Sequence, residues 1–364
     1  MRKTFYEVGE AEQPLRLGFI GCGAFASSTL LPCIPRIPEI DLVATCDLAE
    51  SRAEYCAKRF GAKVWYTDYE KMIEEQHPDA VAIVGPPTMH LELGVACFKL
   101  GVHVYSEKPN APTVEGSRLL METAKQNGKF GQVGFMWRHA QAHKIARNII
   151  ESKDFGEPVL FRGAYLTPGP IAPLPETHGD TLEWTYLLDQ GVHVIDCMRF
   201  LMGKEVSTLY ALIEYRKNAS KLDSALSFSV SLRFENGATG TLSMSSFYPG
   251  FEKYLFVQGD GSQAVDIYNK EDLRHLKRGA WFLPPPPAGT RGYEALPSGL
   301  PTQEWNPGPF HWISPGYLEE LQHFARCMLK NEQPRPSLED AYQVMRVCKA
   351  IVDSHTEGRA ISPR

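Results

Sequence analysis

Leu15-Arg16-Leu17-Gly18-Phe19-Ile20-Gly21-Cys22-Gly23-Ala24-Phe25-Ala26 is the segment that decides the fold of the first part of this chain. Residues 15–20 form a short apolar run, typical of a buried strand, that leads directly into the pattern G-x-G-x-x-A. The first glycine permits a tight turn, the second lets the backbone approach a pyrophosphate, and Ala26 is small enough for close helix packing. The pyrophosphate would lie at the N-terminus of the next helix. The segment therefore predicts a dinucleotide-binding Rossmann fold.

An acidic residue, Asp47, ends the second predicted strand, Ile40 to Cys46. Its carboxylate can accept hydrogen bonds from an adenosine ribose and would repel a 2′-phosphate, so it favours NAD over NADP. The alternative is that Asp47 caps a helix predicted from Ala49 to Phe60. Arg52 lies near enough in sequence to offer a 2′-phosphate partner. We expect NAD, with NADP less favoured.

Strands and helices alternate through the rest of the first part. Further strands are predicted at 63–65, 80–84, 102–105 and 130–134, and helices at 27–31 (interrupted by Pro32 and Pro35), 69–75 and 90–100. This spacing predicts a parallel, doubly wound sheet, whose ligands bind beyond the carboxyl ends of the strands. Lys108 follows one such end and can stabilise a developing alkoxide electrostatically, with an ordinary surface lysine as the alternative.

Strand patterns dominate the second part of the chain. After a helix at 140–151 they occur at 159–166, 207–215, 225–234, 239–245, 254–257 and 264–267, and helices at 317–330 and 338–355 close the chain. Glu235-Asn236-Gly237 is typical of a hairpin turn. We therefore expect an α/β protein with a Rossmann domain at 1–136 and, at 137–364, an α+β domain for substrate binding and oligomerisation, with an open, mainly antiparallel sheet.

Polar residues interrupt the apolar segment from Tyr186 to Leu201. An α-helix of about 3.6 residues per turn would place Asp189, His193 and Asp196 on one face. A carboxylate one turn from an imidazole can fix its tautomer and stabilise its protonated form, as a proton-abstracting histidine requires. The alternative is a buried helix whose His and Asp only satisfy each other, and this segment alone favours both equally.

Together these motifs resemble one family, the Gfo/Idh/MocA oxidoreductases, over nearly the whole chain. The resemblance depends on residues 21–26, the Pro86 to His90 loop, Glu107-Lys108-Pro109, Gly134-Phe135 followed by Arg138, and residues 189–196. It implies that Lys108, Asp189 and His193 are catalytic and that Pro86, His90 and Glu107 line the nicotinamide end of the cofactor site. Met136-Trp137 differ from the polar pair that many relatives carry before the arginine.

The candidate site residues follow from the motifs and the resemblance. For the dinucleotide they are Gly21, Gly23, Ala24, Phe25, Ala26, Asp47, Arg52, Pro86, Pro87, His90, Glu107 and Lys108. For the substrate they are Lys108, Trp137, Arg138, Tyr165, Trp184, Asp189 and His193. The resemblance implies a sugar, sugar derivative or cyclitol, bound between the domains and oxidised at a secondary alcohol. His193 would take the hydroxyl proton, Asp189 would orient His193, and Lys108 would stabilise the oxyanion.

Two other functions remain open on the same fold. One is a lyase or glycosidase-like reaction in which NAD oxidises the sugar transiently and is regenerated. The other is a non-enzymatic sugar sensor, against which the presence of Lys108, Asp189 and His193 argues.

Composition favours small-molecule chemistry in the cytoplasm. The chain has 364 residues, 43% of them hydrophobic, and a net charge of −5, which gives no electrostatic footprint for nucleic acid or an anionic membrane. The eight cysteines form no C-x-x-C pair, so we expect them to be reduced. We expect no metal, no transmembrane helix and no signal peptide.

Two further features bear on assembly. In Leu226 to Leu232 serines alternate with apolar residues, which predicts an open sheet face of small side chains. The resemblance implies pairing through that face, as a homodimer or homotetramer. Two proline-rich segments, Thr167 to Asp180 and Phe282 to Pro315, are long enough to be functional loops. The second either packs on its own domain, lies at the cleft mouth, or reaches a neighbouring subunit.

Overall fold

The computed structural model describes residues 13–167, 181–216, 225–269, 272–277 and 316–363. They divide into two compact units, one from Met1–Gly134 with Tyr317–Ala341 and the other from Phe135–Gly316 with Tyr342–Arg364. The sequence predicts one boundary, at 136/137, which would place helix α8 (Tyr317–Leu329) in the second domain. In the structure α8 belongs to the first unit, where Arg326 Nη2 pairs with Glu39 Oε1 at 2.7 Å.

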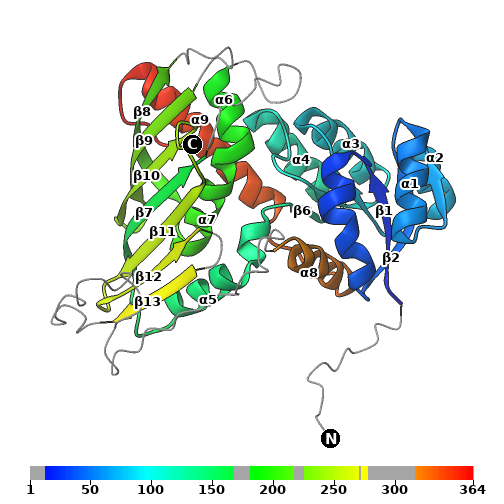
Figure 1. The fold of residues 1–364 in the computed structure, drawn as a ribbon, viewed down its shortest axis with the longest axis horizontal. Coiled ribbons are helices and arrows are strands. Elements are labelled where there is room, and N and C mark those ends of the chain that lie inside the picture. The colour runs from blue at the N-terminus through cyan, green and yellow to red at the C-terminus, as the bar shows by residue number, and fades with distance from the viewer. Residues whose placement is uncertain (1–12, 168–180, 217–224, 270–271, 278–315, 364) are drawn as a thin grey trace, which may run out of the picture. The chain divides into compact units, whose positions relative to one another are not determined.

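The first unit is built on a six-stranded parallel sheet. Its strands are β1 (Leu15–Ile20), β2 (Ile40–Cys46), β3 (Val64–Tyr66), β4 (Ala80–Ile83), β5 (His103–Ser106) and β6 (Gly131–Val133), in the order β3-β2-β1-β4-β5-β6. The helices that connect the strands are α1 (Glu50–Phe60), α2 (Tyr69–Gln76), α3 (Pro87–Lys99) and α4 (Val114–Gln126) (Figure 1). The order reverses at β1 and β4, and ligands of doubly wound sheets bind at such a switch point.

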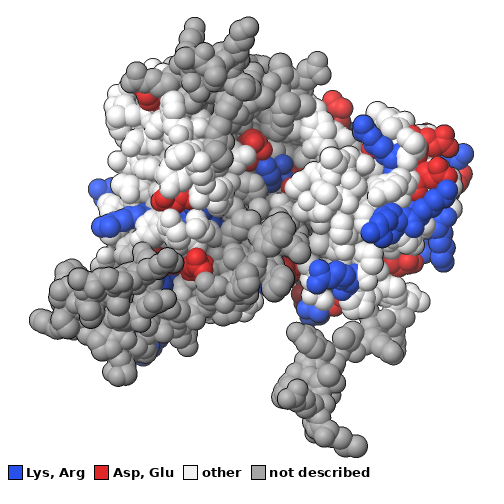
Figure 2. Space-filling view, viewed as in Figure 1, with Lys and Arg blue, Asp and Glu red and all other residues white. Residues whose placement is uncertain are grey.

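Surface charges on the first unit are mixed in sign. Figure 2 shows acidic and basic side chains interspersed over the end of this unit that carries α1 and α2. Two of the pairs are one turn apart, Glu54 with Lys58 at 2.7 Å and Lys71 with Glu75 at 3.7 Å. Such pairs support the exposed helix faces by a few tenths of a kcal/mol each, roughly, and give no field of a single sign.

The second unit is built on a seven-stranded, mostly antiparallel sheet. Its strands are β7 (Pro158–Leu166), β8 (Val206–Arg216), β9 (Ala225–Phe234), β10 (Thr239–Ser245), β11 (Glu252–Gly259), β12 (Gln263–Tyr268) and β13 (Asp272–Lys277), in the order β13-β12-β11-β7-β10-β9-β8. Only the β7–β10 pair is parallel among these neighbours. The expected hairpin joins β9 to β10, with Gly237 at a φ of 85°.

Helices cover one face of this sheet. Figure 1 shows α5 (Gln141–Ile150) and α7 (Val192–Met202) lying along it, with the short α6 (Leu182–Tyr186) before α7; α9 (Leu338–Glu357) closes the chain. The alternation predicted in β9 is confirmed, because Leu226, Phe228, Val230 and Leu232 are buried and Ser229 and Ser231 are exposed. The serine side of the sheet is therefore the side away from the apolar core.

Two predicted helices are corrected by the structure. After the glycine motif the chain forms a π-helical turn at 26–30 and then a 3-10 helix at 31–36. Pro32 and Pro35 lie within this 3-10 helix, whereas the predicted helix was interrupted by them. The segment from Tyr186 to Leu201 is not one α-helix, because residues 187–191 form a π-helical turn between α6 and α7. Both proline-rich segments, apart from Thr167, lie outside the described residues.

No helix in the described part of the chain is long and apolar enough to cross a membrane.

Candidate active site

The glycine motif forms an open turn after β1. Gly21 has a φ of 94°, and a Cβ there would lie 2.0 Å from the Val84 carbonyl oxygen, so no other residue fits. A Cβ on Gly23 would meet no atom within 4 Å. Gly21 thus serves the turn, while the surface above Gly23 is open to a ligand, as a backbone that contacts a pyrophosphate requires.

Asp47 organises the same turn from the end of β2. One carboxylate oxygen accepts a hydrogen bond from the Cys22 amide and the other from the Ala49 amide, both at 2.8 Å. The capping alternative is wrong, because the N-cap of α1 is Ala49, without a side-chain cap. Each carboxylate oxygen has a second lone pair for a ribose hydroxyl. The glycine turn and Asp47 therefore fit the ribose and pyrophosphate of a dinucleotide.

The remaining cofactor candidates around this turn differ in exposure. Ala24, Phe25 and Arg52 are exposed and Ala26 is buried. The Phe25 ring packs edge-on against Tyr317 of α8, with centroids 5.8 Å apart. Arg52 lies in the first turn of α1, where an exposed guanidinium is available to a phosphate.

His90 joins two loops at the carboxyl ends of the strands. Its Nε2 accepts a hydrogen bond from the Gly85 amide at 3.1 Å, and its Nδ1 lies 2.8 Å from the Pro109 carbonyl oxygen. Since the amide can only donate, Nδ1 carries the proton and donates to Pro109. The ring is fully buried. His90 thus holds the loop that contains Pro86 and Pro87 to the loop that contains Lys108.

Glu107 belongs to a buried acidic cluster that no sequence motif predicts. The Tyr105 hydroxyl lies 3.1 Å from Glu107 Oε1 and 2.8 Å from Glu320 Oε1, and the Lys108 amide donates to Glu107 Oε2. Burial raises the pKa of Glu107 to about 7, against the opposing charge of Lys108. Burial, together with the Glu107 charge, raises the pKa of Glu320 well above its ordinary value. Like charges so close cannot both ionise without cost, so the cluster retains a proton.

We expect Glu320→Gln to stabilise the protein at high pH. Between the unfolded carboxyl pKa of about 4.3 and the raised folded value, the folded state binds more protons than the unfolded state, so stability falls as the pH rises. Glutamine cannot ionise. Urea unfolding should therefore show that the stability of the variant relative to the wild type is greater at pH 8 than at pH 5 by about 1–3 kcal/mol. An unchanged difference between the two pH values would contradict a shared proton.

The π-helical turn sets the position of Asp189. The expected sharing of a helix face by Asp189, His193 and Asp196 assumed α-helical spacing, which holds within α7 but not across residues 187–191. The Asp189 carboxylate accepts a hydrogen bond from Gln190 Nε2 at 2.7 Å, and Gln190 Oε1 accepts one from the Tyr165 hydroxyl at 2.9 Å. Asp189 and Tyr165 are thus linked through Gln190. The pairing of Asp189 with His193 stays a prediction.

Trp137 lies at the centre of an aromatic cluster. Its ring centroid is 5.0 Å from that of His193, 5.6 Å from that of Tyr165 and 6.3 Å from that of His143. Trp137 and His193 are 5% and 8% exposed. The structure therefore brings three of the predicted substrate residues together within the second unit. Trp184, in α6, is partly exposed, and its amide donates to Thr181 Oγ1.

Arg138 and Asp196 form a buried ion pair beside this cluster. Arg138 Nε and Nη2 donate to the two Asp196 oxygens at 2.8 and 2.6 Å, and the two side chains are 7% and 1% exposed. The guanidinium also lies 5.4 Å from the Phe200 ring centroid. This two-point contact joins α7 to the segment that precedes α5, and so fixes the helix that carries His193.

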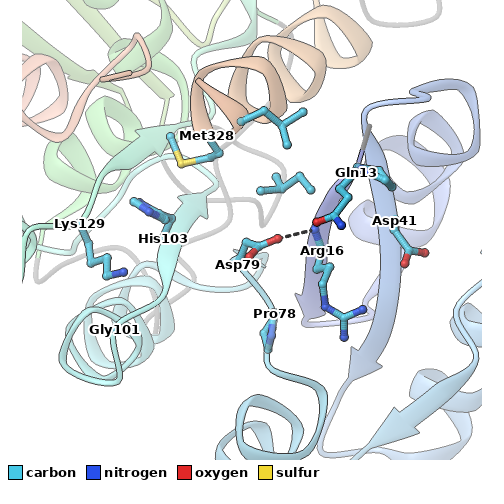
Figure 3. Close-up of a pocket in the computed structure, with 12 residues that line it drawn as sticks. Gln13, Arg16, Asp41, Pro78, Asp79, Gly101, His103, Lys129 and Met328 are labelled. Carbon is cyan, nitrogen blue, oxygen red and sulfur yellow. Dashed lines mark hydrogen bonds between the residues drawn. The ribbon is translucent and has the colours of Figure 1, made fainter. Parts of the chain in front are cut away.

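A separate cavity of about 740 Å³ lies in the first unit, at the opposite edge of the parallel sheet. Figure 3 shows Asp79 accepting a hydrogen bond from the Arg16 amide in it, at 2.9 Å, and Lys129 and His103 also line it. These residues stand at the amino ends of the strands, so the cavity is distinct from the turn at Gly21. Among the described side chains no group of three or more His, Cys, Asp or Glu could hold a metal ion.

Comparison with protein-family models matches both parts of the chain. The model described as an oxidoreductase family with an NAD-binding Rossmann fold matches residues 15–135, and the GFO/IDH/MocA C-terminal domain model matches residues 143–265. Among curated proteins, the chain is 26% identical to scyllo-inositol 2-dehydrogenase (NAD(+)) of Bacillus subtilis over 359 residues, 96% of each chain. It is also 26% identical to levoglucosan dehydrogenase of Pseudarthrobacter phenanthrenivorans, over 94% of this chain and 96% of that one.

Solved structures share the fold over the same length. A dehydrogenase from Chromobacterium violaceum has a TM-score of 0.81 at 23% identity, covering 95% of this chain and 96% of that one. Levoglucosan dehydrogenase in complex with NADH and L-sorbose has a TM-score of 0.77 at 22% identity, covering 97% and 99%. The parallel sheet and the second, mostly antiparallel sheet are thus those of an established two-domain architecture.

Proposed function

The chain belongs to the Gfo/Idh/MocA oxidoreductases, with an NAD-binding Rossmann domain, and from that premise we propose that it oxidises a secondary alcohol of a sugar, sugar derivative or cyclitol. The observation that carries the proposal is the pair of features on the two units: an open glycine turn fixed by Asp47, and a buried His193 against Trp137. The two named relatives, an inositol and a levoglucosan dehydrogenase, support the substrate class.

Bound NAD supplies the hydride acceptor. In the proposed reaction His193 takes the proton of the substrate hydroxyl, and Asp189 stabilises the imidazolium that forms. Lys108 stabilises the oxyanion that develops on the same oxygen. The proposal therefore requires that Lys108 and His193 act on one hydroxyl group.

Trp137 and Tyr165 are proposed to contact the substrate. An indole and a phenol present apolar ring faces to the C–H side of a sugar and leave its hydroxyls to polar partners. Arg138 is held in place by its ion pair with Asp196 and is proposed to support this surface.

A panel of sugars and cyclitols with NAD tests this function. We expect accumulation of NADH with at least one polyol, with a carbonyl product of matching amount. Conversion of a sugar without net NADH would instead favour the transient-oxidation alternative. Binding of a sugar without any conversion would favour the sensor.

The cofactor preference depends on Asp47 and is tested by Asp47→Ser. Its carboxylate would repel a 2′-phosphate through like charge, so the wild-type chain should bind NAD more tightly than NADP. In the variant the ratio of the two dissociation constants should move toward NADP by about tenfold or more. Tighter binding of NADP by the wild type would overturn the assignment and indicate Arg52 as a phosphate partner, and Arg52→Ala would then reverse it.

A closed homodimer or homotetramer through the serine face of the second sheet is proposed as the assembly. The exposed row of Ser229, Ser231 and Thr241 supports it, because small side chains let two sheets approach closely. Light scattering coupled to chromatography should give a mass of two or four chains, and a monomer at micromolar concentration would exclude this interface.

A further inference from the structure

The Tyr105 hydroxyl lies between two buried carboxyl groups of the first unit. It is 3.1 Å from Glu107 Oε1 and 2.8 Å from Glu320 Oε1. A hydroxyl has one proton, so it can donate to only one of these two oxygens. The other contact is a hydrogen bond only if that carboxyl group carries a proton and donates it to Tyr105. The geometry therefore requires at least one proton on the two carboxyl groups.

The contacts of the two carboxyl groups indicate which of them holds this proton. Glu107 Oε2 accepts a hydrogen bond from the Lys108 amide, so Glu107 accepts at both oxygens when Tyr105 donates to Oε1. Glu320 Oε2 is buried and has no hydrogen-bond partner in the described part of the chain. An ionised carboxylate needs more hydrogen-bond donors than a protonated one. Glu320 therefore keeps the retained proton, and Glu107, whose pKa burial raises to about 7, ionises first.

Other ionisable groups of the first unit lie around the two carboxyl groups. They are Lys108 after β5, Tyr317 and Glu319 on α8, Cys33 on the 3-10 helix, and His90 on α3, which contacts the Pro109 carbonyl. The positive charge of Lys108 opposes the rise that burial causes in the pKa of Glu107. A second positive charge brought near Glu107 would act in the same direction.

The strand order predicts where the nicotinamide half of the cofactor lies. Asp47, which fits the adenosine ribose, follows β2, and the glycine turn follows β1. Glu107 follows β5, which lies on the other side of β1 in the order β3-β2-β1-β4-β5-β6. A dinucleotide bound at the switch point extends across the carboxyl ends of both halves of such a sheet. The nicotinamide half is therefore expected on the side of β4 and β5, where Glu107 lies.

We propose that binding of NAD⁺ releases the Glu107 proton to solvent, whereas binding of NADH does not, so that the preference between the oxidised and the reduced cofactor changes with pH. The two cofactors differ by one positive charge, on the nicotinamide ring. A cation near a buried carboxyl group favours its ionised form, and the effect is reciprocal, so ionised Glu107 favours NAD⁺. The affinity for NAD⁺ should therefore rise with pH through the range in which Glu107 loses its proton.

The test measures the dissociation constants of NAD⁺ and NADH for the full-length protein by titration calorimetry. If the bound cation lowers the pKa of Glu107 by about one unit, the affinity for NAD⁺ relative to NADH should rise about three- to tenfold between about pH 6 and pH 8. Near pH 7, two buffers of different ionisation enthalpy should show release of about 0.4 proton per NAD⁺ and almost none per NADH. Effects of pH on the shared adenosine and pyrophosphate contacts cancel in this comparison.

Three variants identify the group that loses the proton. Glu107→Gln cannot ionise, so the ratio of the two dissociation constants should be equal at about pH 6 and pH 8. Glu320→Gln should keep the wild-type dependence, because its neutral amide can donate to Tyr105 as the protonated carboxyl group does. Glu319→Gln, at an exposed position on the same helix, is the matched control and should also keep it.

A wild-type ratio that does not change with pH would overturn the proposal. So would a pH dependence that persists in Glu107→Gln or disappears in Glu320→Gln. If Glu107→Gln does not fold, as judged by circular dichroism, Tyr105→Phe takes its place. Its missing hydroxyl removes a hydrogen bond that lowers the pKa of Glu107, so the midpoint of the change should move to higher pH, and an unmoved midpoint would reject the proposal.

The proposal depends on the NAD site and not on the proposed substrate. Both cofactors are titrated without a sugar or cyclitol, so a failed substrate panel would reject the proposed oxidation and leave the proton release to be decided by calorimetry.

Discussion

Replacing His193 with alanine is expected to lower kcat about 10²- to 10⁴-fold, because a positioned general base contributes that much to proton transfer. Lys108→Ala should cost a similar factor through loss of oxyanion stabilisation. Asp189→Asn should be milder, since the amide retains the contact to Gln190 and loses only the charge. Steady-state kinetics with the substrate found in the panel measure all three.

NAD binding separates a catalytic loss from a folding defect. His193 lies in the second unit, whereas the glycine turn and Asp47 lie in the first, so the dissociation constant for NAD should change less than about threefold in His193→Ala. His355→Ala, on α9, is a matched control that should keep full turnover. Undiminished turnover in both His193→Ala and Lys108→Ala would contradict their catalytic roles. His193 would then belong to a buried helix in which His and Asp only satisfy each other, and Lys108 would be an ordinary surface lysine.

Much of the fold could be predicted because strand patterns are local. The predicted limits of β1, β2, β9 and β10 agree with the structure, since each is an apolar or alternating run bounded by polar or turn residues. β13 was missed, because Asp272-Leu273-Arg274-His275-Leu276-Lys277 has only two apolar residues. In the structure Arg274 pairs with Asp266 of β12, so this edge strand is held by an ion pair as well as by its backbone.

The π-helical turn could not be predicted from the spacing of polar and apolar residues in the sequence. Its sequence, Leu187 to Gly191, fits an α-helix equally well, and the structure has a π-helical turn there. Gly191 is closely packed in this turn, because a Cβ there would lie 2.8 Å from Leu187 Cδ2. Single π-turns within helices often occur at functional sites, which agrees with the proposed role of Asp189.

Long-range side-chain clusters were the other part that the sequence did not reveal. Tyr105 contacts Glu320 across 215 residues of chain, and His143 contacts Lys253 across 110. Neither Glu320 nor Lys253 belongs to a recognisable motif, so only the packed fold brings them to the motif residues. The motifs identify the candidate site residues, whereas some of the charged side chains in contact with their neighbours come from elements far along the chain.

Breaking the Arg138–Asp196 pair should have the largest effect on stability. Arg138→Met leaves the Asp196 carboxylate, which is 1% exposed, without its two-point partner, and such a loss costs about 3–5 kcal/mol. The double variant Arg138→Met with Asp196→Leu should recover most of this, because it removes both charges and fills similar volume. Hydrogen exchange of α7 amides as a function of urea reports the unfolding free energy of this part of the second unit.

An exposed ion pair provides the comparison that makes this result specific. Lys58 and Glu54 lie 2.7 Å apart, but their side chains are 67% and 40% exposed, so Lys58→Met should change the free energy of unfolding by less than about 1 kcal/mol. If Arg138→Met cost no more than Lys58→Met, α7 would be held by its apolar contacts alone. The position of His193 would then depend on Trp137 and the residues around it, and the Arg138→Met enzyme should retain its kcat.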